Sequence, residues 1–233
     1  MSTFNICTDR RELGAWAARP LHLASAQRAR LRLLEAQDGR RLGDYFAGLS
    51  EETRGYFSPH PLDGETAQRL CAAVGQDEAL RYVATVSGED GERVIAYLIL
   101  QLGVPEDERG RCHSSGTPLD PQLDCTFAAS MADGWQGQQL GDLLMAPLIA
   151  VSLRLERRYV VLLGGTQGRS RGAIRFYQRR GFRTVGRFEH PRGRMNCDMV
   201  LPLGHVGSTN LRREQTAPVP RVAKPSLQSM ALA

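Results

Sequence analysis

Arginines alternate with apolar residues in the first clearly patterned segment of the chain. From Arg28 to Leu33, every second residue is an arginine and those between are apolar, a period of two that predicts a strand with one solvent-facing side. The preceding residues show no clean period. We therefore interpret residues 1–27 as an N-terminal extension and expect the domain to begin at Arg28.

A helical spacing follows this strand. Apolar residues recur three and four positions apart from Leu42 to Leu49, which predicts a helix capped by Asp38. A second helix is predicted over residues 50–56, because the prolines that follow cannot continue it. A third helix is predicted to begin at Asp63.

Strands and helices alternate through the rest of the patterned region. A polar stretch over residues 104–121 is long for a loop in a compact domain, and we interpret it as a mobile flap. After residue 203, proline, glycine and scattered charge predict a flexible basic tail over residues 204–233. The other elements are predicted as a hairpin of 81–86 and 93–102, strands over 123–131, 159–163, 183–188 and 196–201, and helices over 138–154 and 170–180.

The length and composition fit one globular domain. At 233 residues the chain can build a single core, and 42% of its residues are hydrophobic against 24% charged. Much of the net charge of +5 comes from the tail, where four basic residues stand against one glutamate. Because the body is nearly balanced, we expect no nucleic-acid partner. No apolar stretch reaches the roughly 18 to 20 residues that span a membrane, so we expect no membrane partner.

The cysteine and histidine patterns point away from disulfides and metal sites. Five cysteines are an odd number, widely spaced and without a Cys-x-x-Cys pair, so neither a disulfide framework nor a zinc ribbon is indicated. The five histidines lack the spacing typical of metal ligands. We therefore expect no metal and a reduced, cytoplasmic location.

The segment with the clearest chemical meaning lies between a predicted strand and a predicted helix. It reads Trp135-Gln-Gly-Gln-Gln-Leu-Gly, a glycine-rich turn that directs main-chain N–H groups outward at a helix N-terminus. Such a turn can bind a pyrophosphate, although an ordinary strand-to-helix connection has the same pattern. Further along, a predicted helix ends at Gly181, and the aromatic residue Phe182 follows.

These two blocks resemble the signature motifs of the GNAT acetyltransferase superfamily. The family's pyrophosphate loop, Gln/Arg-x-x-Gly-x-Gly/Ala, is similar to residues 136–141, and its Tyr-x-x-x-Gly-Phe block is similar to residues 177–182. Residues 131–141 and 46–58 look most similar to bacterial protein lysine acetylases. The resemblance implies a GNAT domain over residues 28–203 of class α/β. Its mostly antiparallel sheet of six or seven strands would be splayed at one pair to admit coenzyme A, with helices on both faces.

The resemblance also assigns roles to individual residues. Main-chain groups of Ala129 and Met131 would pair with the pantetheine arm and the thioester carbonyl of acetyl-CoA. Tyr177 stands at the position of the usual general acid, although a core aromatic of an amphipathic helix is the alternative, and Ser170 stands where the family often has an asparagine. Gln139 replaces a glycine of the family pattern. The diphosphate would bind to the turn residues Gln136, Gly137, Gln138, Gln139, Leu140 and Gly141.

The identity of the general base is open. Protein acetylases of this kind often carry a glutamate on the strand before the loop, where this chain has Thr126. Asp124 lies two residues earlier on the same strand face and could take the proton directly or through water, or be a solvated acid at the strand end. Cys125 allows an acyl-cysteine intermediate, but no histidine or lysine stands near it in sequence to lower the thiol pKa, which favours an inert thiol.

We therefore expect an acetyl-CoA-dependent N-acetyltransferase that moves an acyl group to a primary amine by direct attack in a ternary complex. The attack develops an oxyanion, which a main-chain N–H can stabilise, and expels a thiolate, which a phenol can protonate. Protein lysine is the favoured acceptor. Two other functions remain open: acetylation of a small amine such as an amino sugar, polyamine or antibiotic, and non-catalytic binding of acyl-CoA. The oligomeric state, monomer or dimer, is open as well.

Overall fold

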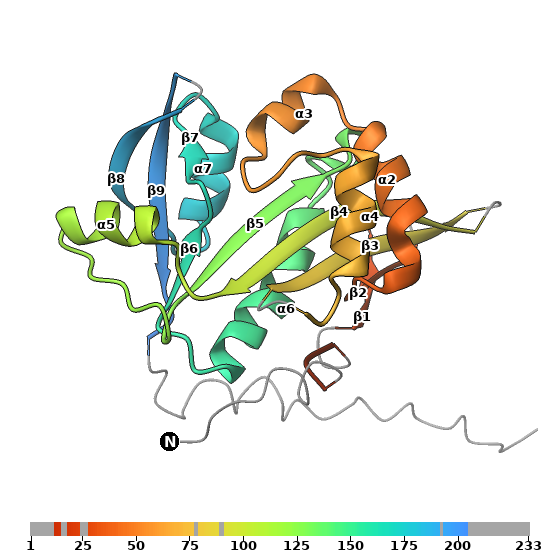
Figure 1. Cartoon of the computed structure of the whole chain (residues 1–233), viewed down its shortest axis with the longest axis horizontal. Helices are drawn as coiled ribbons and strands as arrows, with labels where there is room; N and C mark the ends of the chain where they lie inside the picture. The colour runs from red at the N-terminus through yellow and green to blue at the C-terminus, as the bar shows by residue number, and fades with distance from the viewer. Residues whose placement is uncertain are drawn as a thin grey trace, which may run out of the picture. The chain divides into compact units, whose positions relative to one another are not determined.

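The computed structural model of the 233-residue chain describes residues 12–14, 18–23, 28–76, 79–88, 91–191 and 193–204. Within these ranges the chain forms a nine-stranded sheet with helices on both faces (Figure 1). Of the predicted tail only Gly204 is described, so the tail stays a prediction.

The described strands form one sheet in the order β1-β2-β3-β4-β5-β6-β9-β7, and β8 pairs with β9. The pairing of β5 with β6 is parallel and the other described pairs are antiparallel. The strands are β1 (Arg19–His22), β2 (Arg28–Leu33), β3 (Ala79–Gly88), β4 (Gly91–Leu102), β5 (Cys125–Met131), β6 (Tyr159–Leu162), β7 (Thr166–Gln167), β8 (Arg183–His190) and β9 (Arg194–Pro202). The helices are α2 (Gly39–Ala47), α3 (Glu51–Tyr56), α4 (Gly64–Ala72), α5 (Glu106–Ser114), α6 (Leu140–Arg154) and α7 (Arg171–Gln178), with the 3-10 turns η1 (Ala36–Asp38) and η2 (Asp133–Trp135).

The predicted α/β class and the mostly antiparallel sheet are confirmed. The nine described strands exceed the predicted six or seven, because β1 and β7 have four and two residues and are too short to show a period. β1 pairs with β2 from Arg19↔Leu31 to His22↔Arg28, so the sheet includes part of the segment that we interpreted as an extension. The predicted domain boundaries at residues 28 and 203 stay predictions.

Asp38 precedes α2 as predicted, but its side chain does not cap the helix. The buried carboxylate accepts hydrogen bonds from the Arg32 guanidinium at 2.6 and 2.8 Å and from the main-chain N–H of Glu35. Arg32 also donates to Glu92 of β4 at 2.8 Å. Burial opposes ionisation of Asp38, but the hydrogen bonds outweigh it and hold the pKa of Asp38 below its ordinary value. The network ties the start of α2 to β2 and β4.

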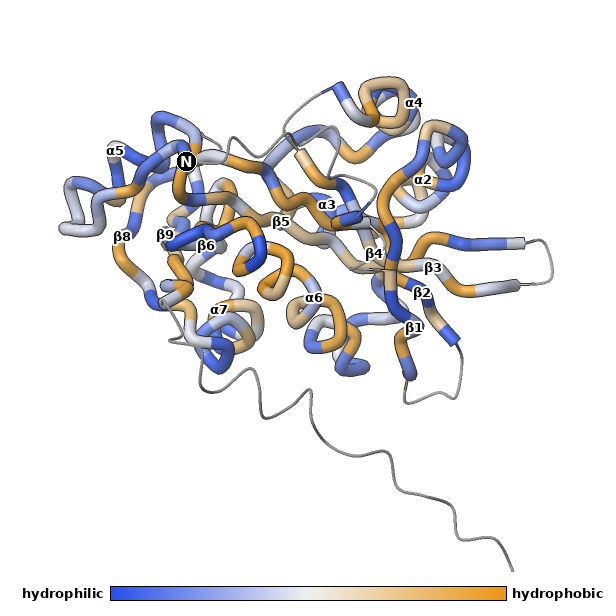
Figure 2. Tube along the Cα trace, turned by 90° about the horizontal axis from the view of Figure 1, so that it is seen from below, coloured by the Kyte–Doolittle hydropathy of each residue, from blue (hydrophilic) through white to orange (hydrophobic). Residues whose placement is uncertain are grey.

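The helices cover the two faces of the sheet through alternating apolar residues. On one face, α6 and α7 pack against side chains such as Phe127 of β5. On the other face, α2 and α4 pack against side chains such as Ala128. Val161 of β6 lies opposite Thr126 and so shares the face of Ala128, and α5 packs there through Cys112. Figure 2 shows the largely apolar α6 beside the sheet. None of the described helices is long and apolar enough to cross a membrane.

Helix α5 corrects the prediction of a mobile flap over residues 104–121. The nine residues of α5 contain a single apolar side chain, Cys112, so the sequence carries no helical period there. Its first turn holds three acidic residues, which favour a helix N-terminus. Arg111 donates to both carboxylate oxygens of Asp198 on β9 at 3.0 to 3.3 Å, which fixes the helix to the sheet.

Strands β5 and β6 separate soon after they meet. Their pairing covers three positions, from Cys125↔Val160 to Phe127↔Leu162, and the N–H of Leu163 then donates to the carbonyl of Phe127 at 2.8 Å. β5 continues to Met131, whereas the chain leaves β6 through a turn at Gly164 and Gly165. We call the opening between the two strands the splay; it confirms the predicted splayed strand pair.

The turn that opens the splay requires glycine at position 165. Gly165 has a φ of +67°, and a Cβ there would lie 2.8 Å from the carbonyl oxygen of Cys197. We predict that Gly165→Ala lowers the free energy of unfolding by about 3 kcal/mol, because left-handed strain and a steric clash combine. Gly193→Ala is the matched control, since Gly193 has a φ of +69° with no atom within 4 Å of the added Cβ. The control should lose only about 1 kcal/mol in urea unfolding, and equal losses would contradict the prediction.

Candidate active site

The turn from β5 into α6 presents a row of free main-chain donors. Gly137 and Gln139 have left-handed φ values of +73° and +62°, and α6 begins directly after them. In the part of the chain that the structure describes, no hydrogen bond uses the main-chain N–H groups of residues 137–141. They lie at the N-terminus of a fifteen-residue helix, where the helix dipole favours an anion. The turn can therefore bind a phosphate group.

Gln139 occupies a backbone conformation that favours glycine. It has φ +62° and ψ 0°, and its side chain is exposed. A non-glycine residue pays about 1 to 2 kcal/mol for this left-handed region. The glycine that the family resemblance expects at this position would remove the strain, so Gln139 departs from the family pattern at a cost in stability.

A set of hydrogen bonds that sequence analysis missed holds this turn against α3. The Asp133 carboxylate accepts hydrogen bonds from the main-chain N–H of Ser50 at 2.9 Å, from the Ser50 hydroxyl at 2.6 Å and from the Thr53 hydroxyl at 2.6 Å. These bonds lower the pKa of Asp133 to about 2. Gln136 donates to the Thr53 hydroxyl at 3.0 Å and to the carbonyl of Met131 at 3.2 Å. The side chain of Gln136 therefore shapes the turn.

Gly141 allows α6 and α7 to approach closely. A Cβ at position 141 would lie 2.7 Å from the ring of Phe176 on α7. The Arg180 guanidinium stacks on the same Phe176 ring, 3.6 Å from the ring centroid. Gly141, which we predicted as part of the phosphate turn, thus also sets the distance between the two helices. Ser170 directly precedes α7 and is half-buried, and its carbonyl accepts from Ile174.

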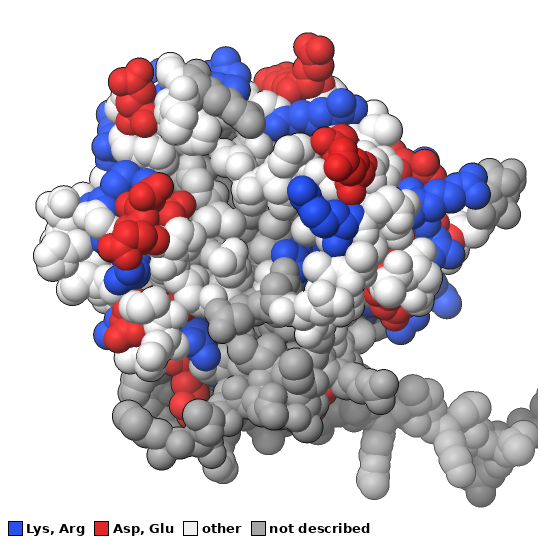
Figure 3. Space-filling model, in the orientation of Figure 1, with Lys and Arg blue, Asp and Glu red and all other residues white. Residues whose placement is uncertain are grey.

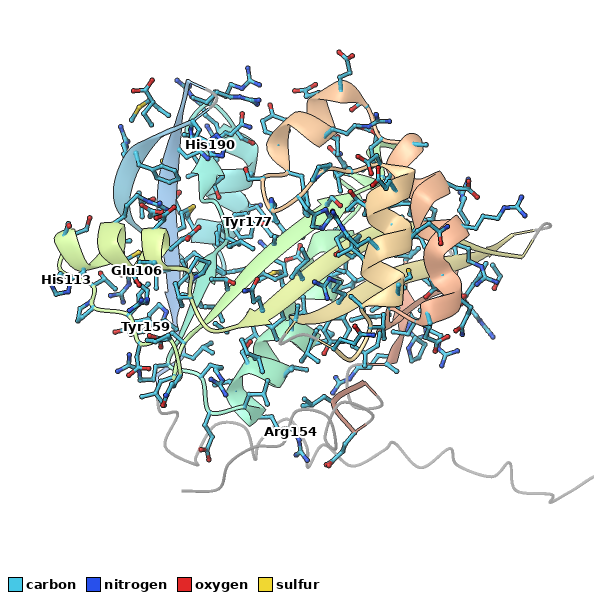
Figure 4. The ribbon with its side chains drawn as sticks, viewed as in Figure 1. Glu106, His113, Arg154, Tyr159, Tyr177 and His190 are labelled. Carbon is cyan, nitrogen blue, oxygen red and sulfur yellow. The ribbon has the colours of Figure 1, made fainter. Side chains whose placement is uncertain are left out.

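Tyr177 lies on α7 next to the core that also contains Phe127. Its ring packs edge-on against Phe176 and Phe182, with ring centroids 5.1 and 5.2 Å away. Figure 4 shows Tyr177 on the side of α7 that faces β5. Burial raises the pKa of Tyr177 to about 12, so the phenol keeps its proton at neutral pH. The predicted general acid is therefore protonated and lies beside the splay.

Ala129 and Met131 direct their main-chain groups toward the splay. The carbonyl of Phe127 accepts from Leu163 of the β6 side, and main-chain groups of a strand repeat their direction every two residues. Ala129 and Met131 therefore present N–H and C=O groups on the same side, beyond the last position at which the described β6 pairs with β5. These groups can bind an extended ligand as a further strand would.

Asp124 has the surroundings of a structural ion pair. It is fully buried, and its carboxylate accepts from Arg158 at 2.9 and 3.2 Å and from the main-chain N–H groups of Asp120 at 2.6 Å and Tyr159 at 3.1 Å. These four donors of the protein occupy both oxygens of the carboxylate. This geometry is that of a structural ion pair, and the role of Asp124 as the base stays a prediction. The ion pair was not visible in the sequence, because Arg158 lies 34 positions away from Asp124.

The neighbours of Asp124 on β5 are equally enclosed. Thr126 is fully buried, and its hydroxyl has no hydrogen-bond partner among the described residues. The thiol of Cys125 is buried beside Ser152, and burial raises the pKa of Cys125 to about 12. A thiol of this pKa is not ionised at neutral pH, which agrees with the interpretation of Cys125 as an unreactive thiol.

A wide pocket of about 1120 Å³ opens on another part of this surface. It lies between α2, the β3–β4 hairpin and η2, and charges of both signs line it, including Arg41, Glu92 and Arg93. Neither Tyr177 nor Ala129 lines it. Its lining extends to residues 132–135, directly before the turn, but includes none of residues 136–141, so we keep the splay and the turn as the predicted site.

Solved structures with the same arrangement include GNAT acetyltransferases. The GNAT domain of S. lividans PAT matches with a TM-score of 0.61 at 20% identity, covering 81% of this chain and 98% of that chain. This chain has the GNAT fold. A GNAT-family acetyltransferase from Streptococcus pneumoniae matches with a TM-score of 0.56 at 17% identity, covering 76% of this chain and 99% of the other. AAC(6')-Ib, in complex with paromomycin and acetyl-CoA, matches with a TM-score of 0.55 at 19% identity, covering 82% and 98%. No protein-family model matches the chain, and neither does any curated protein sequence.

The GNAT fold explains why the two sequence motifs matter together. The turn at residues 136–141 and Tyr177 belong to different helices, and the contact between Gly141 and Phe176 brings those helices side by side. Both motifs therefore border the splay, although one is formed by main-chain groups and the other by a side chain.

The structural role of Asp124 leads to a prediction. Asp124→Asn should lower the free energy of unfolding by about 2 kcal/mol, because a buried carboxylate with four donors is replaced by an amide that cannot accept them all. The effect should appear in urea unfolding, while any acyltransfer activity of the folded protein stays within about twofold of wild type. A large loss of activity at unchanged stability would restore Asp124 as the base.

Proposed function

We propose that this GNAT-fold chain transfers an acetyl group from acetyl-CoA to a primary amine by direct attack in a ternary complex. The observation that carries the proposal is the row of free main-chain N–H groups over residues 137–141, at the start of α6 and beside the splay. A diphosphate is the anion that such a row suits, and the splay suits an extended arm. The acetyl-CoA complex of the neighbour AAC(6')-Ib supports the same choice of ligand.

The free main-chain N–H groups of the turn and the splay beside it suit acetyl-CoA. Residues 136–141 would hold the diphosphate, and the main-chain groups of Ala129 and Met131 would hold the pantetheine arm and the thioester. Ser170, at the start of α7, would lie beside that arm. Acetyl-CoA would supply the activated acyl group.

The side chains of the site then have limited but specific tasks. A main-chain N–H of β5 would stabilise the oxyanion that forms when the amine attacks. Tyr177 would donate its phenolic proton to the departing sulfur, since its pKa of about 12 keeps that proton available at neutral pH. The buried Cys125 takes no part, which leaves direct transfer to the amine.

We propose protein lysine as the acceptor, on the likeness of residues 131–141 and 46–58 to protein lysine acetylases. The complex of the neighbour AAC(6')-Ib with paromomycin supports the alternative, a small amine. Thiol release with lysine-containing peptides and with a panel of small amines decides between them. Acetyl-CoA binding without turnover of any amine would indicate the non-catalytic module.

A cytoplasmic location stays a prediction from the cysteine pattern.

Acetyl-CoA binding tests the proposed function directly. We expect isothermal calorimetry to detect a complex with acetyl-CoA, and Gln139→Gly to bind at least as tightly while gaining about 1 kcal/mol in unfolding free energy. The contrasting variant is Gly137→Ala, which places a side chain at a φ of +73° where no atom crowds it, and it should lose affinity and stability through backbone strain. If the wild-type protein shows no affinity for acetyl-CoA, the proposed function is wrong.

Tyr177→Phe tests the proposed general acid. We expect kcat to fall about 100-fold, because the departing thiolate loses its proton donor, while the Kd for acetyl-CoA stays within about twofold. The control is Tyr159→Phe, a half-buried tyrosine of β6 outside the proposed site. In the wild type, kcat should not fall on the alkaline side below about pH 10, since the raised pKa keeps Tyr177 protonated there. An unchanged kcat in Tyr177→Phe would remove Tyr177 from the mechanism.

A further inference from the structure

The proposed transfer needs a proton acceptor that the strand before the turn does not offer. A lysine-type ammonium has a pKa of about 10.4 in water and must lose a proton before its nitrogen can attack. Thr126 stands where the family resemblance expects a glutamate, and Asp124 is engaged by Arg158 and two main-chain N–H groups. We therefore looked for a carboxylate that another element brings to the splay and that could accept the proton.

Helix α5 brings the Glu108 carboxylate to the splay. Figure 4 labels Glu106 on the first turn of α5 and His113 near its last turn, and the first turn lies closer to β5. Glu108 is 7% exposed, and its Oε1 accepts from the main-chain N–H of Gly164 at 3.1 Å. Gly164 directly follows Leu163, whose N–H marks the last contact between the two strands. Glu108 thus contacts the point where β5 and β6 separate.

Half of the Glu108 carboxylate remains available. In the described part of the chain, Oε2 of Glu108 receives no hydrogen bond. Arg111 Nη2 lies 3.7 Å from Oε1, and the same guanidinium donates to both oxygens of Asp198. Cys112, the other titratable neighbour on α5, stays a neutral thiol because burial raises its pKa to about 11. Glu108 therefore shares Arg111 with Asp198, which lies closer to the guanidinium at 3.0 Å.

Asn196 supplies a second acceptor at the same place. It lies on β9 with 2% of its surface exposed, and its Nδ2 donates to the carbonyl of Gly164 at 2.8 Å. Its Oδ1 is buried and has no hydrogen-bond partner among the residues described. Buried polar atoms are normally paired, so this oxygen points to a ligand that donates hydrogen bonds. An ammonium group, which has three N–H donors and no acceptor, has the required chemistry.

Glu108 and Tyr177 lie on opposite faces of the sheet. α5 packs on the face of Val161, whereas Tyr177 packs with Phe127 on the other face. Figure 3 shows the surface on the α5 side hollowed between α5 and α3. A shallow pocket in this region is lined by Gly55, Ser58, Gln167, His190, Arg194 and Asn196. An amine bound on the α5 face would meet the thioester from the side opposite the phenol.

We infer that Glu108 is the proton acceptor for the attacking amine and that Asn196 Oδ1 helps to hold that amine, an inference that rests on the proposed function. An N–H bond of the ammonium breaks and its proton passes to Glu108 Oε2. The freed nitrogen lone pair forms a bond to the thioester carbonyl carbon, and the C–S bond breaks with its electron pair on sulfur. The sulfur takes the proton of Tyr177. The second proton lost by nitrogen returns to the Tyr177 phenolate through water, and Glu108 releases its proton to solvent.

The test compares Glu108→Gln with Glu106→Gln in the full-length chain. Glutamine keeps an oxygen for the N–H of Gly164, and Glu106 is an exposed residue on the same helix. The probes are a lysine-containing peptide, spermidine and kanamycin, taken with acetyl-CoA. For Glu108→Gln we expect kcat to fall about 100-fold at neutral pH and to recover partly toward pH 10, where more of the amine is already neutral. Glu106→Gln should match wild type.

Binding and rescue separate this role from a structural one. In Glu108→Gln, calorimetry should give an unchanged Kd for acetyl-CoA and a Kd about tenfold weaker for the amine probe with CoA bound. In Glu108→Ala, added formate should restore part of kcat, because a free carboxylate can replace the missing one. A near-normal kcat in Glu108→Gln overturns the inference. So does a loss that is equal at all pH values and not rescued by formate in Glu108→Ala. If wild type binds no acetyl-CoA or acetylates no probe, the proposed function itself fails before any variant is compared.

Discussion

The separation of β5 from β6 is the constraint on which the rest of the structure depends. The two strands pair at three positions and then part, because the chain leaves β6 through two consecutive glycines with left-handed φ values. Beyond Phe127, the main chain of β5 faces an opening instead of a partner strand. The turn before α6, the phenol of Tyr177 and the first turn of α5 all reach this opening. Each group that we propose for binding or catalysis is placed by it.

An opening of this kind exposes main-chain groups that a closed sheet would pair, so the fold must stabilise its edges elsewhere. The whole length of β5 pairs with β4, from Leu102↔Cys125 to Ala96↔Met131. The Asp133 carboxylate binds the N-terminus of α3 and holds the far end of β5 there. At the other end, Asp124 binds Arg158 and the start of β6. Because both ends of β5 are held in place, the main-chain groups in its middle can stay unpaired and available to a ligand.

The parts of the fold that follow from local pattern could be predicted from the sequence. The alternation from Arg28, the prolines after α3 and the glycine turn before α6 each act through the residues next to them. α5 could not be predicted, because only Cys112 of its nine residues is apolar and its position depends on the contact of Arg111 with Asp198, 87 residues away. The ion pair of Asp124 could not be predicted for the same reason, since its partner Arg158 lies 34 residues away at the start of another strand. Side-chain chemistry was visible in the sequence, but the distant partners that decide its use were not.

The proposed binding site consists of main-chain groups, and such a site is compatible with the 13 to 20% identity to the structural neighbours. Main-chain N–H groups exist at every position except proline, so the phosphate turn constrains backbone angles more than residue types. Gln139 illustrates this freedom, because it adopts the left-handed angles of a glycine and leaves the donors in place at a modest cost in strain. Side-chain functions have no such tolerance. Thr126 stands where the family resemblance expects a carboxylate on β5, and in our proposal α5 supplies that carboxylate from outside the sheet, without a change in the strands.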